Sequence, residues 1–173
     1  MKKKAKQQKG FSLVEMIMYV GVVAVVFVVV VNMTLSVASI WNNARVKRNI
    51  ITQGGSALER ILYELRLANS VDAAGSVFGV SPGTVKVNTI VSPDDATPTT
   101  REFFADASAL KLRENGTDTF LITDVTITNL IFYRIENADT SEAVRVVLTI
   151  EDGNRTSKQT QTFYGAAVLR GSY

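Results

Sequence analysis

The chain of 173 residues contains no cysteine and no histidine. Without cysteine it forms no disulfide bond, so the folded part must be stable through its core alone, even in an oxidising compartment. The same absence excludes zinc sites built on Cys or His, and it excludes Ser-His-Asp and Cys-His catalytic units. An enzyme would need a carboxylate pair, and no acidic cluster stands out from the acids of the predicted loops. We therefore expect no enzymatic activity, no metal site and no cofactor.

Negative charge is also missing at the start of the chain, where positive charge is concentrated. The formal net charge is +3, but five of the 19 basic residues are Lys2, Lys3, Lys4, Lys6 and Lys9. Without residues 1–10 the chain has 14 basic and 16 acidic residues, a net charge of −2. Because the basic character belongs to the leader, the composition gives little support to nucleic-acid binding.

Proline is absent before position 82, and the first part of this stretch is strongly apolar. In residues 11–31 only Ser12, Glu15 and the Tyr19 hydroxyl are polar. As a helix this run of 21 residues would reach roughly 30 Å, the thickness of a hydrocarbon core. A secretory signal has a shorter apolar core followed by a small-residue cleavage site, and Asn-Met-Thr after Val31 fits such a site poorly. We therefore predict a retained transmembrane helix over residues 11–31.

The lysines give this helix an orientation. A cluster of lysines before a membrane span stays on the cytoplasmic side, according to the positive-inside rule. Residues 32–173 are then predicted to lie outside the cytoplasm.

The helical pattern continues beyond the apolar run, over residues 32–69. Residues 56–68 place Leu58, Ile61, Leu62 and Leu65 on one stripe of an amphipathic helix. The charged side chains between them, at Glu59, Arg60, Glu64 and Arg66, are predicted to lie mostly on the solvated side.

Gly54-Gly55 interrupts this pattern, and Ser56-x-x-Glu59 behind it matches a capping box that could start a new helix. The sequence allows one long helix with a local bend, or two helices that meet at a short joint. We favour one helix.

Residues 70–173 have the two-residue alternation of half-buried strands, separated by turn residues. The polar segment 92–100 is predicted to be a loop, and Asn115-Gly116 is a strong hairpin signal. Strands are predicted at 84–91, 101–105, 109–114, 118–123, 125–136, 142–152 and 160–170. With no helix between the strands, we expect an α+β fold in which a mainly antiparallel sheet packs on the amphipathic end of the helix.

The segment from Lys9 to Met16, KGFSLVEM, lies between the lysine leader and the apolar helix. It resembles the prepilin signature of type IV pilins and type II secretion pseudopilins. The resemblance implies a pilin-like fold and cleavage between Gly10 and Phe11 by prepilin peptidase, which then methylates the new amino terminus of Phe11. Residues 1–10 would be the leader peptide.

Glu15 would then be the fifth residue of the mature chain. An ionisable residue in a membrane helix is a functional candidate, because it is costly without a partner. In the family, pairing of this carboxylate with the terminal amine of a neighbouring subunit is thought to set the axial stagger of the filament. Alternatively, Ser12-x-x-Glu15 is itself a capping box, so that Glu15 simply starts the helix. The two roles are compatible.

Two features differ from many major pilins. Asn32 occupies a position where they often have proline, and the C-terminal disulfide loop is impossible without cysteine. The stretch 58–68, followed by strands that contain Arg101-Glu102-Phe103-Phe104, is similar to the minor pilin W and pseudopilin J group. This similarity implies a low-copy subunit.

Together these patterns predict a structural, non-enzymatic subunit of a type IV pilus or a related type II secretion filament. It would be a single-pass protein of the cytoplasmic membrane with a β-rich extracytoplasmic head at residues 70–173. Its expected partners are prepilin peptidase, other pilin subunits and the pilus assembly platform, with no direct nucleic-acid binding. The alternative is an uncleaved, membrane-anchored binding protein.

Overall fold

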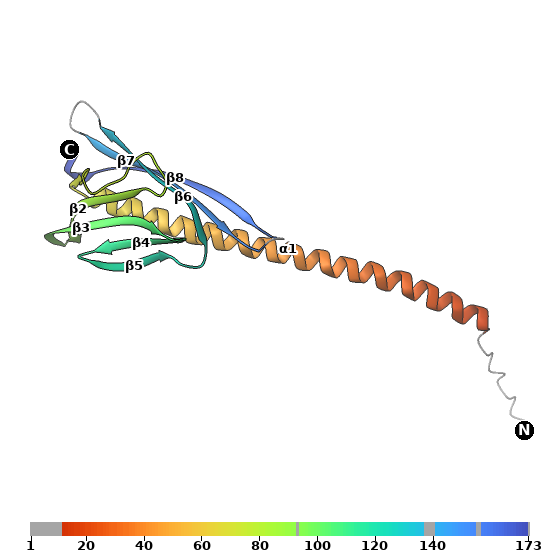
Figure 1. Ribbon diagram of the computed structural model, residues 1–173. Helices are drawn as coiled ribbons and strands as arrows, with labels where there is room; N and C mark the ends of the chain where they lie inside the picture. The colour runs from red at the N-terminus through yellow and green to blue at the C-terminus, as the bar shows by residue number, and fades with distance from the viewer. Residues whose placement is uncertain (1–11, 93, 137–140, 155–156, 173) are drawn as a thin grey trace, which may run out of the picture. The chain divides into compact units, whose positions relative to one another are not determined.

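The computed structural model describes residues 12–92, 94–136, 141–154 and 157–172. The chain divides into two units, residues 1–41 and residues 42–173. In the described residues one long helix, α1, is followed by eight strands and a short 3-10 helix (Figure 1). Their bounds are α1 Leu13–Leu67, β1 Ser70–Val71, β2 Thr84–Ser92, β3 Asp95–Asp106, β4 Ala109–Glu114, β5 Thr117–Ile122, β6 Thr126–Glu136, β7 Glu142–Asp152, β8 Gln159–Val168 and η1 Arg170–Ser172.

Helix α1 is continuous over 55 residues. The prediction of one long helix is confirmed, because the helix runs through Gly54 and Gly55 without a break. The capping box at Ser56 therefore starts no new helix. The fold is α+β, as predicted from the succession of one helical segment and many strands.

The strands form two sheets, and every pair of neighbouring strands is antiparallel. The first sheet has the order β1-β2-β3-β4-β5, and the second has the order β6-β7-β8 (Figure 1). The antiparallel arrangement was predicted, but the division into two sheets was not. It follows from the loop after β1, which occupies the edge of β6: Gly79 N donates to Phe132 O at 2.9 Å, and Gly83 N donates to Leu130 O at 2.8 Å.

The predicted loop at residues 92–100 is wrong over most of its length. Strand β3 begins at Asp95, and its first half pairs with β2 from Ser92↔Asp95 to Thr89↔Thr99. Threonine is β-branched and favours strands, and here the ladder with β2 outweighs the turn preference of the Asp and Pro residues. At the start of β3, Asp95 Oδ1 accepts a hydrogen bond from Thr97 N at 3.1 Å.

The core of residues 42–173 lies between α1 and the inward faces of the two sheets. The helix contributes a stripe at three- and four-residue spacing, and it consists of Val46, Ile50, Gly54, Ala57, Ile61, Glu64 and Leu65. Of the predicted stripe, Ile61 and Leu65 are fully buried, whereas Leu58 and Leu62 are partly buried against the core. The buried stripe is therefore longer than predicted and is rotated slightly.

Glu64 corrects a prediction, because its side chain is fully buried rather than solvated. Its carboxylate forms an ion pair with Arg101 of β3, whose side chain is 6% exposed. The Arg101 ion pair uses Glu64 Oε2. Glu64 Oε1 lies 2.7 Å from Arg60 Nη2, which is close enough for an ion pair, although the two groups are not aligned as a hydrogen bond. A buried carboxylate requires such compensation because removing its water is costly.

Arg101 connects three parts of the structure. Besides Glu64 of α1, its guanidinium binds Glu114 of β4 through Nε at 3.1 Å and Nη2 at 2.9 Å. Nη2 also donates to the carbonyl of Val91 at 2.8 Å, at the end of β2. The planar fork of arginine can satisfy several acceptors at once, and here it links the helix to the first sheet.

The second sheet approaches α1 closely because two glycines face the contact. A Cβ built on Gly54 would lie 2.8 Å from Ile150 Cδ1, and closer still to the ring of Phe163. On β8, a Cβ on Gly165 would lie 2.8 Å from Leu62 Cδ1. Gly54 thus has a packing role that explains its presence within a helix. Gly55 has nothing within 4 Å of the corresponding position.

Gly54→Ala is expected to destabilise the protein by about 1–3 kcal/mol, because the added methyl group overpacks the contact with β7 and β8. The matched variant Gly55→Ala adds the same methyl group where there is room, and it should stabilise the helix by about 0.5–1 kcal/mol. Urea unfolding of the full-length protein in detergent, followed by circular dichroism, measures both. Equal effects of the two variants would contradict the packing role of Gly54.

Arg101→Met is expected to destabilise the protein by about 3–5 kcal/mol, because it leaves the carboxylate of Glu64 buried without its principal partner. The control is Arg113→Met on the neighbouring strand. The side chain of Arg113 is 42% exposed, compared with 6% for Arg101, and its guanidinium lowers the pKa of Asp118 through hydrogen bonds at the surface. Its replacement should change the unfolding midpoint little. A midpoint for Arg101→Met equal to that of Arg113→Met would show that the buried pair is not important for stability.

Candidate membrane and assembly segment

The described part of the chain begins at Ser12, which caps the first turn of α1. Ser12 Oγ accepts a hydrogen bond from Val14 N at 3.3 Å, and the Ser12 carbonyl accepts from Met16 N at 3.1 Å. Ser12 is therefore the N-cap of α1, while the reciprocal bond from Glu15 that would complete the predicted capping box is not among the hydrogen bonds of the described residues. The predicted processing residues Gly10 and Phe11, and the leader residues Lys2, Lys3, Lys4, Lys6 and Lys9, lie outside the described residues.

Glu15 lies in the first turn of α1 and is exposed. A carboxylate is favourable there because the helix dipole is positive at the N-terminus. Together with Ser12, Met18, Tyr19 and Val22, it lines a shallow groove along one side of the helix. No other described residue forms an ion pair with Glu15.

The apolar side chains of the helix after Glu15 are also exposed. Helix α1 is long and apolar enough to cross a membrane, and none of its most apolar 18-residue window is buried. Such a helix typically anchors a protein in a membrane or directs its export. The exposed positions include Leu13, Met16, Ile17, Val20, Val23, Phe27 and Val30.

Exposed apolar residues continue beyond Val31, which the sequence reasoning did not anticipate. Met33, Leu35, Ile40 and Trp41 are each more than 60% exposed. The hydroxyl groups among them donate to carbonyls of their own helix. The bonds are Thr34 Oγ1 to Val30 O at 2.8 Å, Ser36 Oγ to Asn32 O at 2.9 Å and Ser39 Oγ to Ser36 O at 2.8 Å.

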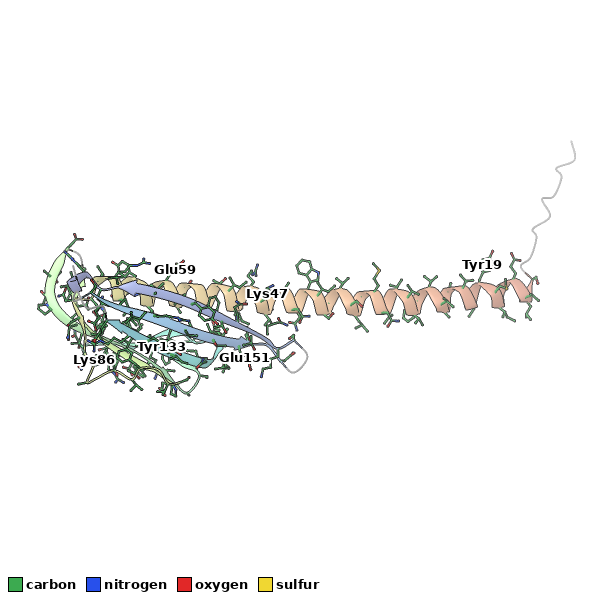
Figure 2. All side chains as sticks on the ribbon, turned by 90° about the horizontal axis from the view of Figure 1, so that it is seen from above. Tyr19, Lys47, Glu59, Lys86, Tyr133 and Glu151 are labelled. Carbon is green, nitrogen blue, oxygen red and sulfur yellow. The ribbon has the colours of Figure 1, made fainter. Side chains whose placement is uncertain are left out.

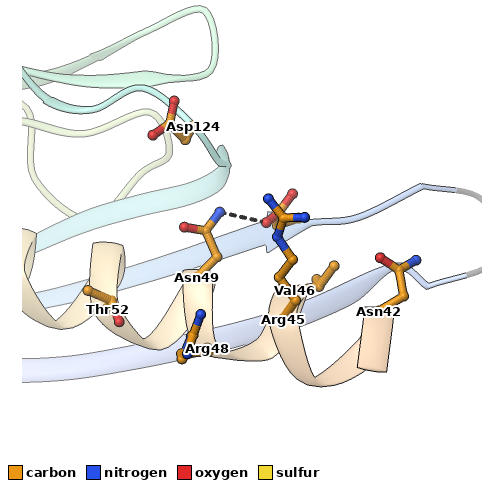
Figure 3. Close-up of a pocket in the computed structure, with 8 residues that line it drawn as sticks. Asn42, Arg45, Val46, Arg48, Asn49, Thr52 and Asp124 are labelled. Atoms are coloured by element: carbon orange, nitrogen blue, oxygen red, sulfur yellow. Dashed lines mark hydrogen bonds between the residues drawn. The ribbon is translucent and has the colours of Figure 1, made fainter. Parts of the chain in front are cut away.

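The next part of α1 begins to contact the β-strands and carries three basic residues. Asn42 Nδ2 donates to Ser157 Oγ at 3.3 Å, and Asn49 Nδ2 donates to Asp152 Oδ2 at 2.9 Å. Around these contacts lies an open hollow whose polar lining includes Asn42, Arg45, Arg48, Asn49, Thr52, Asp124 and Asp152 (Figure 3). Lys47 lies on the same helix outside this hollow (Figure 2).

Three pairs of adjacent aromatic residues lie in the strands: Phe103-Phe104 in β3, Phe132-Tyr133 in β6 and Phe163-Tyr164 in β8. Phe163 is partly buried against the core. Phe103 and Phe132 are fully buried, whereas Tyr133 is 39% exposed and Tyr164 is 65% exposed. One residue of each pair thus belongs to the core. In the described part of the chain, no three His, Cys, Asp or Glu side chains are grouped as a metal ion requires.

Comparison with protein-family models, with curated proteins and with solved structures found no match. The candidate site therefore depends on the residues and geometry described above: an exposed apolar helix with one carboxylate in its first turn, continuing into a helix packed on antiparallel sheets.

Proposed function

We propose that this protein is a structural subunit of a type IV pilus or a related type II secretion filament. In this proposal the leader is removed between Gly10 and Phe11 by prepilin peptidase. The mature chain resides in the cytoplasmic membrane and then enters a filament through its N-terminal helix. Its similarity to the minor pilin W and pseudopilin J group suggests a low-copy subunit.

The observation that carries the proposal is the contrast along α1. Residues from Val46 onwards bury a stripe against the sheets, whereas the apolar residues before Trp41 are exposed within this chain. Exposed apolar surface on this scale requires lipid or other proteins to cover it. A helix that is apolar on all sides suits a lipid bilayer first and a bundle of identical or related helices later.

Glu15 would supply specificity to such a bundle. In apolar surroundings an unpaired carboxylate is costly, and an ammonium group at close range offsets that cost. Cleavage before Phe11 creates an amine four residues from Glu15. The amine of a neighbouring subunit would select one axial register, because other registers leave Glu15 unpaired.

The alternative is a membrane-anchored binding protein whose leader is never removed. The exposed apolar helix and the β-rich head are equally compatible with it. The two possibilities differ in the chemistry of the N-terminus, and they also differ in whether the protein is recovered in filaments.

Processing predicts a mature protein that begins with a methylated Phe11. Intact-mass spectrometry of the protein from its native membrane should give the mass without residues 1–10, plus one methyl group. Gly10→Val should leave the leader attached, because a branched side chain prevents the chain from lying flat in a protease cleft. A wild-type protein that retains Met1 would contradict processing and favour the anchored binding protein.

Assembly predicts that Glu15→Ala and the shape-matched Glu15→Gln are processed normally but are lost from filaments. The assembled fraction should fall at least about tenfold, because loss of a desolvated ion pair costs more than 1.4 kcal/mol. Immunoblots of sheared filaments against the membrane fraction measure the ratio. Glu59→Ala, an exposed acid on the same helix, is the control. Normal incorporation of both Glu15 variants would contradict the pairing.

A further inference from the structure

We propose that Arg45, Lys47 and Arg48 bind the phosphate groups of anionic phospholipids in the leaflet nearest the head. In this proposal Trp41 lies at the same membrane interface, so the transmembrane segment is near residues 20–40 rather than 11–31. The proposal rests on the membrane insertion proposed above and assigns a ligand to a surface of helix α1 next to the head.

The three basic side chains are available for such a ligand. All three are exposed, and no carboxylate among the described residues lies within ion-pairing distance of them. They lie within a single turn of α1. Basic residues next to a membrane span are attracted by anionic headgroups, at about 1 kcal/mol per residue.

The surrounding polar groups determine how a headgroup would fit. Arg45 and Arg48 face an open hollow (Figure 3). In this hollow Asn49 donates a hydrogen bond to Asp152, and Asp124 lies across from the helix. The two carboxylates balance the two guanidinium groups, so the excess positive charge comes from Lys47. An anionic phosphate would therefore bind on the helix side of the hollow, beside Arg45 and Arg48 and away from Asp124, with Lys47 on the same helix outside the hollow.

The spacing of charges along α1 places these residues at the depth of lipid phosphates. Between Glu15 and Arg45 there are 29 consecutive residues without a charge. At helical rise they span about 43 Å, which matches the 40–45 Å of a bilayer with its headgroup regions. Glu15 and Arg45 can therefore both lie in headgroup regions at the same time. A span at 11–31 would instead place Glu15 in hydrocarbon.

The aromatic residues support the same placement. Trp41 and Tyr19 are 22 positions apart, about 33 Å along the helix, close to the thickness of the hydrocarbon core. Tryptophan and tyrosine are enriched at the two interfaces of a membrane. The sequence changes to Asn42-Asn43 directly after Trp41.

The polar residues between them are compatible with lipid. The hydroxyl groups of Thr34, Ser36 and Ser39 already donate to helix carbonyls, so they need no water. This placement puts the side-chain amide of Asn32 in hydrocarbon, which is unfavourable. An uncharged amide is nevertheless less costly there than the carboxylate of Glu15 would be.

Trp41 is the only tryptophan, so its fluorescence reports its depth without labelling. The full-length protein is reconstituted in phosphatidylcholine vesicles with phosphatidylglycerol, and quenching by lipids brominated at different depths is compared with quenching by aqueous iodide. We expect strong quenching by shallow bromines and protection from iodide. If the span were 11–31, Trp41 would lie about 15 Å beyond the hydrocarbon, and iodide alone would quench it. That result would overturn the proposal.

The lipid preference is measured by energy transfer from Trp41 to trace dansyl-labelled lipid. We expect several-fold more transfer to dansyl-phosphatidylglycerol than to a dansyl-labelled zwitterionic lipid, reduced by salt. The triple variant Arg45→Gln, Lys47→Gln, Arg48→Gln should lose this preference. Arg66→Gln, an exposed arginine of the same helix 18 positions beyond Arg48, should keep it. Equal transfer to both lipids in the wild type would overturn the proposal. Transfer that depends on the density of protein in the vesicles would indicate that the three cations bind an acidic protein surface instead, and that result would overturn the proposal as well.

These results are separable from the proposed function. Failure of membrane insertion would appear as protein that does not float with the vesicles. A protein that floats but shows no lipid preference would refute only the headgroup site. Processing at Gly10 and incorporation into filaments are measured in other experiments.

Discussion

The rest of the structure depends on the backbone hydrogen bonding of α1. In an α-helix every interior N–H and C=O is satisfied within the segment, so the helix can pass from one solvent to another without changing its backbone. Only its side chains need to match their surroundings. Helix α1 meets this constraint by changing its surface: apolar all round through Val31, apolar with self-bonded hydroxyl groups to Trp41, and amphipathic from Val46 onwards.

The amphipathic part is fixed to the two sheets in two different ways. Toward the second sheet, Gly54 and Gly165 remove side-chain bulk, so the helix and β8 approach closely and shape determines their fit. Toward the first sheet, the charged pair of Glu64 and Arg101 determines the fit, because each would be buried at high cost without the other. The close contact at the two glycines and the pairing of the two buried charges together determine how this end of the helix packs on the two sheets.

These two contacts also mark the limits of what the sequence predicted. Periodicity identified the long helix, the antiparallel strands and the burial of Ile61 and Leu65, since those features repeat at regular spacing. It could not identify Glu64 as buried, because its partner lies 37 positions further along the chain. Similarly, the sequence alone indicates that Gly54 interrupts the helix. The structure shows that its missing side chain leaves room for Phe163 and Ile150. Strand β3 was predicted too short because pairing with β2 outweighed the local turn residues.

Glu15 and Glu64 are two carboxylates on one helix, and their difference bears on function. Glu64 is buried, and its ion-pair partners come from the same chain. Glu15 is exposed and has no ion-pair partner among the described residues, although the helix around it is apolar. In the proposed filament subunit, Glu15 would lie in a headgroup region before assembly, where water and lipid can solvate it. Packing of this helix among other helices would remove that solvation, and a cation from outside the described chain would have to replace it. Under this proposal the same carboxylate would tolerate the membrane as part of a single helix and would constrain the register when helices assemble.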